Sequence, residues 1–148
     1  HAKFYFFDVG IYRRLRPAGP LDAPEEAEGV ALESLVLQEI LALNDALDLG
    51  YKVYYWRDAN GHEVDVVLYG PRGLMAFEVK RTARIAPQAF SGLKAFLDDY
   101  PMAKAFLVYG GDRRLYEGRI EIVPALTMLK GLIGVLSGGA KTGRDSRS

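Results

Sequence analysis

The middle of the chain holds three β-prone segments with room for only short turns between them. The segments are Tyr51–Arg57, His62–Tyr69 and Leu74–Arg81, and the turns are marked by Asn60-Gly61 and by Gly70–Gly73. Gly, Asn and Pro in these positions are typical of turns, and strands joined by short turns pair antiparallel. The sequence therefore predicts a three-stranded antiparallel meander.

A long helix is predicted before the meander, over Val30–Leu49. Apolar residues recur in this segment at helical spacing, and Gly50 suits the position that follows a helix C-terminus. The acidic, turn-rich segment Pro20–Gly29 is predicted to be a loop. The apolar stripe of the helix consists of Leu32, Leu35, Val36, Ile40, Leu43 and Leu47.

A second helix is predicted to open at Pro87, because proline is favoured in the first turn of a helix, and to stop before Pro101. The nearly continuous apolar segment Ala103–Tyr109 is typical of a buried strand. A right-handed crossover would make this strand parallel to the third meander strand. We therefore expect an α/β fold, a three-layer αβββαβ core with a mixed sheet flanked by helices.

The remaining segments extend this core at both ends. Lys3–Phe7 is β-prone, a short helix is expected over Val9–Leu15 after Asp8 as its N-cap, and Ile120–Val123 is a candidate strand. We expect one domain over residues 1–136, with an N-terminal extension (1–28), the core (29–124) and a closing helix (125–136), followed by a flexible tail (137–148).

The composition is that of a globular protein without a membrane segment. Of the 148 residues, 49% are hydrophobic and 26% are charged, and none is cysteine. No apolar run reaches the roughly 18 residues that a membrane span requires. A cysteine-free chain without an apolar leader is typical of a cytoplasmic protein.

The net charge of zero hides an uneven distribution. The totals are 19 basic and 19 acidic residues, which argues against a strongly basic nucleic-acid binder. However, the segment Asp22–Asp48 contains eight acids and no Lys or Arg, so the rest of the chain has 19 bases against 11 acids. The neutrality therefore limits nonspecific attraction to nucleic acid without excluding a local basic face.

Two acidic residues lie in apolar strands on either side of one hairpin. A four-residue loop over Gly70–Gly73 pairs Tyr69 with Leu74, and the same register pairs Asp65 with Glu78. A three-residue loop with Gly73 in a bulge would shift the register by one residue and move Asp65 to the face opposite Glu78. The turn residues are compatible with both loops, so both registers stay open.

The four-residue loop would place four charged side chains on one face of the sheet, since strand side chains alternate. These side chains belong to Glu63, Asp65, Glu78 and Lys80. One interpretation is purely structural: the four side chains form a solvated salt-bridge ladder, in which Glu63 and Lys80 are an ordinary cross-strand pair worth under about 1 kcal/mol.

A metal site is the alternative interpretation of the same residues. Two opposed carboxylates repel each other, and a divalent cation reverses that repulsion. Mg²⁺ commonly takes one or two carboxylates together with water and substrate phosphate, which Asp65 and Glu78 would supply. Lys80 would stabilise a phosphate or activate a water. Glu33, beside the apolar stripe of the first helix, is either a further ligand, a partner for Lys80, or a boundary residue that reaches solvent.

Basic and aromatic residues supply candidate nucleic-acid contacts. Tyr54, Tyr55 and Trp56 either stack on bases or form strand core, and His62 either contacts metal or is simply exposed. The candidate nucleic-acid contacts are Arg13, Arg14, Arg16, Arg57, Arg81 and Arg84.

Five motifs in order carry a resemblance to a known family. They are Lys3–Gly10 (KFYFFDVG), Glu33–Val36 (ESLV), Tyr55–Arg57 (YWR), Glu63–Asp65 (EVD) and Glu78–Lys80 (EVK). An acid in a first helix followed by EVD and EVK in neighbouring strands resembles the PD-(D/E)XK nuclease-like superfamily, which includes restriction endonucleases and archaeal Holliday-junction resolvases. More narrowly, the five motifs resemble the uncharacterised C-terminal domain of bacterial and archaeal AAA+ ATPases.

The resemblance implies a restriction-endonuclease-like fold with Asp65 and Glu78 as metal ligands, Lys80 as the catalytic lysine and Glu33 as the helix acid. It implies Mg²⁺ or Mn²⁺ as cofactor and metal-dependent hydrolysis of DNA as activity. The alternative is a non-catalytic module that binds DNA or packs on an ATPase in cis or in trans. The sequence has no Gly-x-x-x-x-Gly-Lys-Ser/Thr loop, so the chain by itself is not expected to hydrolyse ATP.

Overall fold

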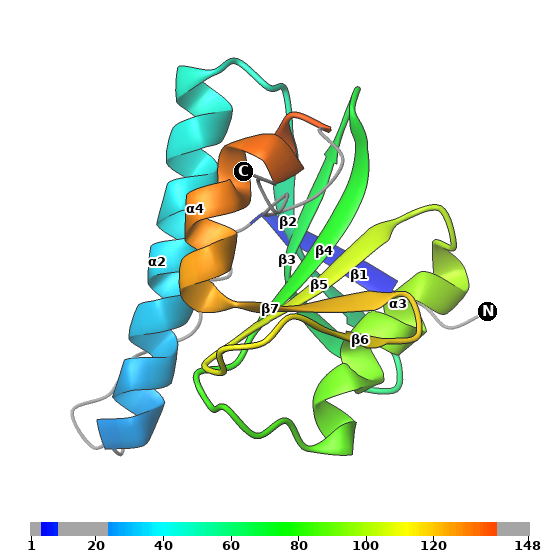
Figure 1. The fold of residues 1–148 in the computed structure, drawn as a ribbon. Coiled ribbons are helices and arrows are strands. Elements are labelled where there is room, and N and C mark those ends of the chain that lie inside the picture. The colour runs from blue at the N-terminus through cyan, green and yellow to red at the C-terminus, as the bar shows by residue number, and fades with distance from the viewer. Residues whose placement is uncertain (1–3, 9–23, 139–148) are drawn as a thin grey trace.

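The computed structural model describes residues 4–8 and 24–138 of the chain. In this part of the chain seven strands form one sheet, in the order β1-β2-β3-β4-β5-β7-β6 (Figure 1). The strands are β1 (Phe4–Asp8), β2 (Lys52–Asp58), β3 (Glu63–Gly70), β4 (Gly73–Val79), β5 (Lys104–Tyr109), β6 (Leu115–Glu117) and β7 (Ile120–Pro124). The helices are α2 (Pro24–Ala46), the 3₁₀ turn η1 (Pro87–Phe90), α3 (Ser91–Asp99) and α4 (Ala125–Leu136).

The sheet is mixed, as expected. Strands β1 to β4 pair antiparallel in sequence order, whereas β4, β5 and β7 run parallel to one another and β6 pairs antiparallel with β7. The predicted meander and the parallel placement of the last core strand beside the third are both confirmed. The order α2-β2-β3-β4-α3-β5 is the expected αβββαβ core.

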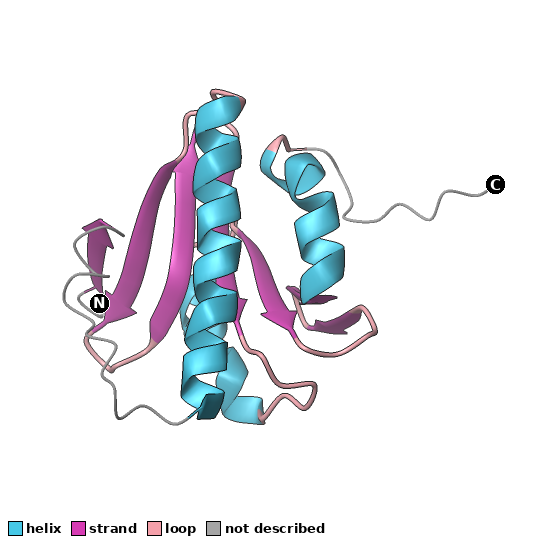
Figure 2. Cartoon of the chain, turned by 90° about the vertical axis from the view of Figure 1, so that its left-hand side faces the viewer, coloured by secondary structure: helices cyan, strands magenta, loops and turns pink. Residues whose placement is uncertain are grey.

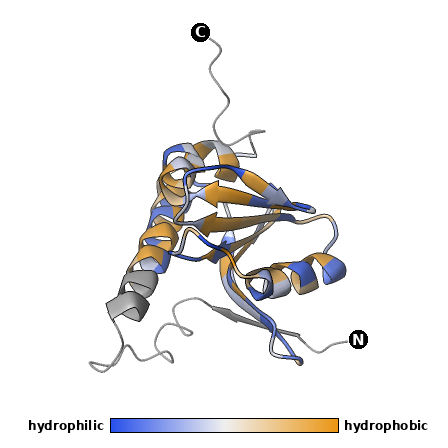
Figure 3. Cartoon of the chain, turned by 60° about the horizontal axis from the view of Figure 1, so that its bottom comes forward, coloured by the Kyte–Doolittle hydropathy of each residue, from blue (hydrophilic) through white to orange (hydrophobic). Residues whose placement is uncertain are grey.

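Helices cover both faces of the sheet and make the fold three-layered. Helices α2 and α4 lie side by side over one face and α3 covers the other (Figures 1 and 2). One buried cluster joins α2 and α4 to the sheet through Ile40, Phe77 and Leu132, and a second joins α3 through Trp56 and Phe96. The hydropathy colouring shows hydrophobic central strands between helices that carry both hydrophobic and hydrophilic residues (Figure 3).

Helix α2 begins and ends earlier than expected. It starts at Pro24, so the prediction of a loop over Pro20–Gly29 is wrong from Pro24 onward, and it ends at Ala46 rather than at Leu49. Proline is favoured at the first helical position, and acidic residues in the first turns interact favourably with the helix dipole. Both signals precede Val30 in the sequence. Two members of the expected apolar stripe, Leu35 and Leu47, are exposed, at 44% and 46%.

The ends of the core contain one strand that the sequence did not indicate. Strand β6 is short and exposed at every position, so it lacks the apolar alternation that predicts strands. The expected helix over Val9–Leu15 lies outside the described residues, as does the tail beyond Gly138. No helix in the described part of the chain is long and apolar enough to cross a membrane.

Candidate metal and phosphate site

The hairpin between β3 and β4 has the register of the four-residue loop. Tyr69 pairs with Leu74, and the regular pairs continue as far as Val66 with Phe77. The alternative three-residue loop is therefore excluded, and Asp65 lies one step beyond the last regular pair. This register brings Asp65 beside Glu78, at the C-terminal end of β4, which is a central strand of the sheet.

Strand β3 contains a bulge at the position of Asp65. Between the pairs Tyr54↔Val67 and Trp56↔Val64, β2 advances by two residues and β3 by three. The extra residue makes Val64 and Val67 face the same buried cluster, on the side of α3. The expectation that four charged side chains share one face by simple alternation is therefore wrong, because the bulge interrupts the alternation at Asp65. Bulges commonly re-aim a side chain beside a functional site.

The two carboxylates take the place of main-chain acceptors where the regular pairing stops. The backbone amide of Asp65 donates to Glu78 Oε1 at 2.9 Å, and the amide of Val79 donates to Asp65 Oδ2 at 3.2 Å. Strand amides point along the plane of a sheet toward the neighbouring strand. Each carboxylate therefore lies between the two strands and binds the backbone of the opposite one.

The electrostatics of Glu78 reflect a crowded negative site. Its side chain is 7% exposed, and burial is the main cause that raises the pKa of Glu78 well above its ordinary value, followed by the negative charge of Asp65. Lys80 and the hydrogen bond from the Asp65 amide act in the opposite direction, and the charge of Glu33 raises the pKa further. Burial and neighbouring acids outweigh the one lysine, so an additional cation here would be favoured.

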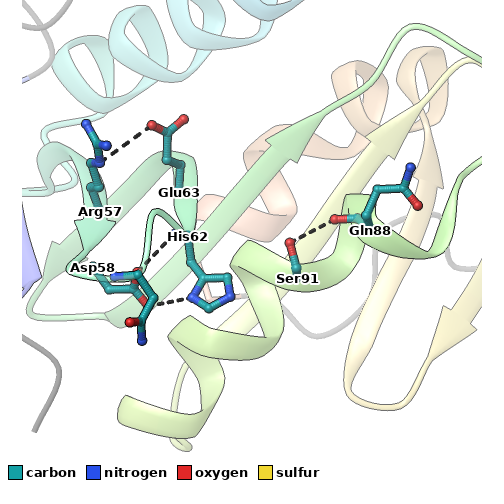
Figure 4. Close-up of polar contacts among 7 residues, drawn as sticks. Arg57, Asp58, His62, Glu63, Gln88 and Ser91 are labelled. Atoms are coloured by element: carbon teal, nitrogen blue, oxygen red, sulfur yellow. Dashed lines mark hydrogen bonds and ion pairs between the residues drawn. The ribbon is translucent and has the colours of Figure 1, made fainter.

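Lys80 and Glu33 approach the carboxylate pair from different elements. Lys80 follows β4 directly, and its Nζ lies 3.6 Å from Glu78 Oε2 while its side chain remains 44% exposed. Glu33 is half-buried on α2, and its charge acts on Glu78. The predicted cross-strand partner of Lys80, Glu63, instead forms an exposed ion pair with Arg57 at 3.9 Å (Figure 4). The structure thus brings together Asp65, Glu78 and Lys80, with Glu33 within electrostatic reach.

A metal ion would meet two carboxylates rather than a full cage of protein ligands. Among the described side chains, no three His, Cys, Asp or Glu residues form a metal-binding group. Mg²⁺ is commonly held by one or two carboxylates and completes its shell with water and phosphate oxygens. The pair Asp65 and Glu78 fits that mode, and the direct ligand role of Glu33 stays a prediction.

The turn between β2 and β3 contains an Asp–His pair that sequence reasoning identified only in part (Figure 4). The buried Asp58 carboxylate accepts hydrogen bonds from the backbone amides of Asn60 and His62, both at 2.9 Å, and contacts His62 Nδ1 at 2.7 Å. Burial alone would raise the pKa of Asp58, but the bonds from His62 and Asn60 outweigh burial and lower it. His62 is thus a partner of Asp58. The Asp-x-Asn-Gly turn pattern was the available signal.

The other predicted contact residues fall into three groups. Arg81 is half-buried and Arg84 exposed in the loop after β4, and Arg57 is engaged with Glu63. Arg13, Arg14 and Arg16 lie outside the described residues. Tyr55 and Trp56 are buried, at 3% and 0% exposure, so the strand-core interpretation is confirmed for both.

Helix α3 is seated closely on the start of β3. A Cβ atom placed on Gly92 would lie 1.9 Å from the carbonyl oxygen of Glu63. The residue before Gly92, Ser91, donates from its hydroxyl to the carbonyl of Gln88 at 2.8 Å (Figure 4). Glycine is therefore required for the approach of α3 to the strand that carries Asp65.

Comparison with known protein families assigns the chain to one of them. A family model described as "Domain of unknown function (DUF4143)" matches residues 28–128, about two thirds of the sequence. The chain belongs to the DUF4143 family. The expected membership of an uncharacterised family is confirmed to this extent, while the links of this DUF4143 chain to AAA+ ATPases and to the PD-(D/E)XK superfamily stay predictions.

The relatives of this DUF4143 chain are longer proteins. The uncharacterized protein Mb2031c of Mycobacterium bovis and the uncharacterized protein Rv2008c of Mycobacterium tuberculosis are each 30% identical to it over 126 residues. The match covers 83% of this chain and 27% of each relative. The chain therefore spans about a quarter of the length of these curated relatives. No solved structure matches it.

Proposed function

We propose that this DUF4143 domain holds a divalent metal ion between Asp65 and Glu78 and hydrolyses phosphodiester bonds in DNA. The observation that supports the proposal is the meeting of the two carboxylates at the bulge of β3, with Lys80 3.6 Å from Glu78. The motifs EVD and EVK contribute the resemblance to the nuclease-like superfamily. The expected cofactor is Mg²⁺ or Mn²⁺, and the expected location is the cytoplasm.

Each residue has a distinct role in this proposal. Asp65 and Glu78 bind the ion, which when bound polarises a phosphate and lowers the pKa of a coordinated water. Lys80 turns from Glu78 toward the phosphate and donates a hydrogen bond to an oxygen that gains negative charge in the transition state. Glu33 is a positioning residue or a further ligand, and Arg81 and Arg84 contact neighbouring phosphates.

A nicking assay tests this function. Supercoiled plasmid and branched DNA are incubated with the protein and Mg²⁺, Mn²⁺ or EDTA, and parent, Asp65→Asn and Lys80→Ala are compared. Glu63→Gln is the matched control, because Glu63 is an exposed acid on the same strand that pairs with Arg57. We expect metal-dependent cleavage by the parent and the control, and a loss of about 10²-fold or more in the two site variants. Metal-independent cleavage, or equal rates in all proteins, contradicts the proposal.

A non-catalytic interaction module is the second candidate. Leu126 and Ile133, seven residues apart on α4, are 64% and 54% exposed, and residues at this spacing lie on one helix face. Because the relatives are much longer than this chain, another domain, such as the expected ATPase, is a suitable partner for that face. Binding of DNA or protein that survives Asp65→Asn and Lys80→Ala, without cleavage by the parent, favours this candidate.

A further inference from the structure

Two loops leave the sheet side by side at the edge that carries the candidate metal site. One loop, residues 80–86, follows β4, and the other, residues 110–114, follows the parallel neighbour β5. The backbone amide of Lys80 donates to the carbonyl of Val108 at 2.8 Å, and the amide of Gly110 donates to the carbonyl of Thr82 at 3.0 Å. The carboxyl ends of neighbouring parallel strands are a common place for ligands in α/β folds.

The contact between the two loops depends on glycine. A Cβ atom placed on Gly110 would lie 2.0 Å from the carbonyl oxygen of Arg81. Any other residue would push the loops apart. The backbone of Arg81 is therefore fixed against the start of the second loop.

The second loop is folded over a buried tyrosine. The hydroxyl of Tyr109 donates to the carbonyl of Arg113 at 2.5 Å and accepts from the amide of Arg113 at 3.2 Å. A Cβ atom placed on Gly111 would lie 2.3 Å from the Tyr109 ring, so the loop passes directly over that ring. Tyr109 itself is 3% exposed. The backbone that carries Arg113 is thus fixed before any ligand binds, which reduces the entropy cost of binding.

The two loops concentrate positive charge beside Glu78. They contain five basic residues and one acid, Asp112. Arg84 and Arg113 are exposed, and neither they nor Arg114 has an acidic partner among the residues that the structure describes. The Nη2 atom of Arg114 is enclosed without a hydrogen-bond acceptor in the same region. The basic residues, hereafter the basic strip, are Lys80, Arg81, Arg84, Arg113 and Arg114.

We propose that the basic strip binds the phosphate backbone of DNA on the side of β5 and leads it to the carboxylate pair. The inference rests on the proposed function for the identity of the polymer. It adds Arg113 and Arg114 as phosphate contacts, and it adds the direction from which DNA approaches. It also assigns a role to the two hydrogen bonds between the Tyr109 hydroxyl and the backbone of Arg113, hereafter the clamp. The cations without an acidic partner, Arg84, Arg113 and Arg114, stand on loops whose backbones are fixed, and they match a polyanion whose charges repeat along its length. Phosphate contacts of this kind position the substrate without reading its sequence.

Fluorescence anisotropy of a labelled DNA duplex tests the strip in EDTA, where metal-dependent cleavage does not interfere. The test variant is Arg84→Gln with Arg113→Gln, one exposed residue from each loop. The control variant is Lys52→Gln with Lys104→Gln, which removes two exposed charges at the first residues of β2 and β5, at the opposite edge of the sheet. Thermal melting of each variant verifies that it is folded.

The expected result is a change in salt dependence. Each lost phosphate contact lowers the slope of log K against log salt by about 0.9, so the test variant should lose about 2 units of slope and the control should match the parent. A second variant, Tyr109→Phe, keeps every charge and removes only the clamp, and it should bind more weakly with a nearly unchanged slope.

The outcomes separate this inference from the proposed hydrolysis. If the parent does not bind DNA in EDTA, or if the test variant binds like the control, the proposed binding of DNA by the basic strip is wrong, even where metal-dependent cleavage is observed. If the test variant loses binding while no protein cleaves DNA, the strip stands and the hydrolytic function falls.

Discussion

The backbone amide of Asp65 donates to the side chain of Glu78 across the end of a hairpin. The side chain of Asp65 in turn accepts from the amide of Val79, the residue after Glu78. The two acids therefore hold two strands together and at the same time repel each other. Such an arrangement is costly for stability unless a cation is bound.

Asp65→Ala and Asp65→Asn should differ in stability although both remove a charge. Alanine leaves the buried amide of Val79 without an acceptor, which costs about 1–3 kcal/mol, whereas asparagine retains an acceptor oxygen. Urea unfolding of the two variants and the parent measures the difference. If alanine and asparagine are equally stable, the hydrogen bond from Val79 carries no weight in the fold.

Glu78→Gln should stabilise the metal-free protein at neutral pH. Because the pKa of Glu78 is raised in the folded state, the folded protein binds its proton more tightly than the unfolded chain. Stability from this group is therefore complete below the unfolded pKa and is lost as pH rises through the folded pKa, by about 1.4 kcal/mol for each unit of difference. Glutamine keeps the acceptor for Asp65 and removes this loss.

The free energy of unfolding of Glu78→Gln and parent, measured from acidic to neutral pH, gives the comparison. The difference should vanish at acidic pH and grow toward neutrality. Glu39→Gln, an exposed acid on α2, is the control and should show little difference at any pH. A variant that is less stable than the parent at neutral pH would mean that the Glu78 charge is already compensated.

Two helical glycines should respond to alanine with opposite signs. Gly92→Ala in α3 places a methyl group 1.9 Å from the Glu63 carbonyl, and the resulting displacement should cost about 1–3 kcal/mol. Gly134→Ala in α4 meets nothing within 4 Å and should gain up to about 1 kcal/mol from helix propensity. The melting temperatures of the two variants and the parent measure these changes in stability. Equal effects would show that the close seat of α3 on β3 does not exist in solution.

Asp58 should stabilise the turn before β3 in a pH-dependent way. Its pKa is lowered by the hydrogen bonds from His62 and Asn60, so its contribution is present above the unfolded pKa and is lost as pH falls through the lowered folded value. Asp58→Ala should cost about 1–3 kcal/mol at neutral pH, because the backbone amides of Asn60 and His62 lose their acceptor. His62→Gln leaves the two amide bonds intact and should cost less. Equal costs would place the stabilisation in the imidazole alone.

The sequence limited the hairpin register to two alternatives, because the turn residues Gly70–Gly73 are compatible with either loop, and the structure selects the four-residue loop. The sequence could not predict the bulge in β3. The residues Val64, Val66, Val67 and Leu68 are all apolar, so an extra residue among them leaves no trace in the alternation. The bulge interrupts the alternation between the hairpin turn and Glu63, so the charge pair that alternation predicts for Glu63 and Lys80 does not form, and Glu63 pairs with Arg57 instead.

Other differences have equally local causes. Helix α2 begins at Pro24 because proline and three nearby acids favour a helix start, a stronger influence than the turn propensity of the segment. The loop contact at Gly110 and the clamp on Arg113 join residues whose chemistry is unremarkable in sequence. The contact at Gly110 forms because β4 and β5 are neighbours in the sheet, whereas the contact of Tyr109 with Arg113 joins residues only four apart in the chain.

The most direct test of the metal site is a crystal of the chain soaked with Mn²⁺ and measured at a wavelength where manganese scatters anomalously. The account predicts an anomalous peak between the carboxylates of Asp65 and Glu78, with the Lys80 ammonium turned away from Glu78, and no peak there in Asp65→Asn. An occupied site elsewhere, or carboxylates still bound to the strand amides with no peak between them at saturating Mn²⁺, would contradict it.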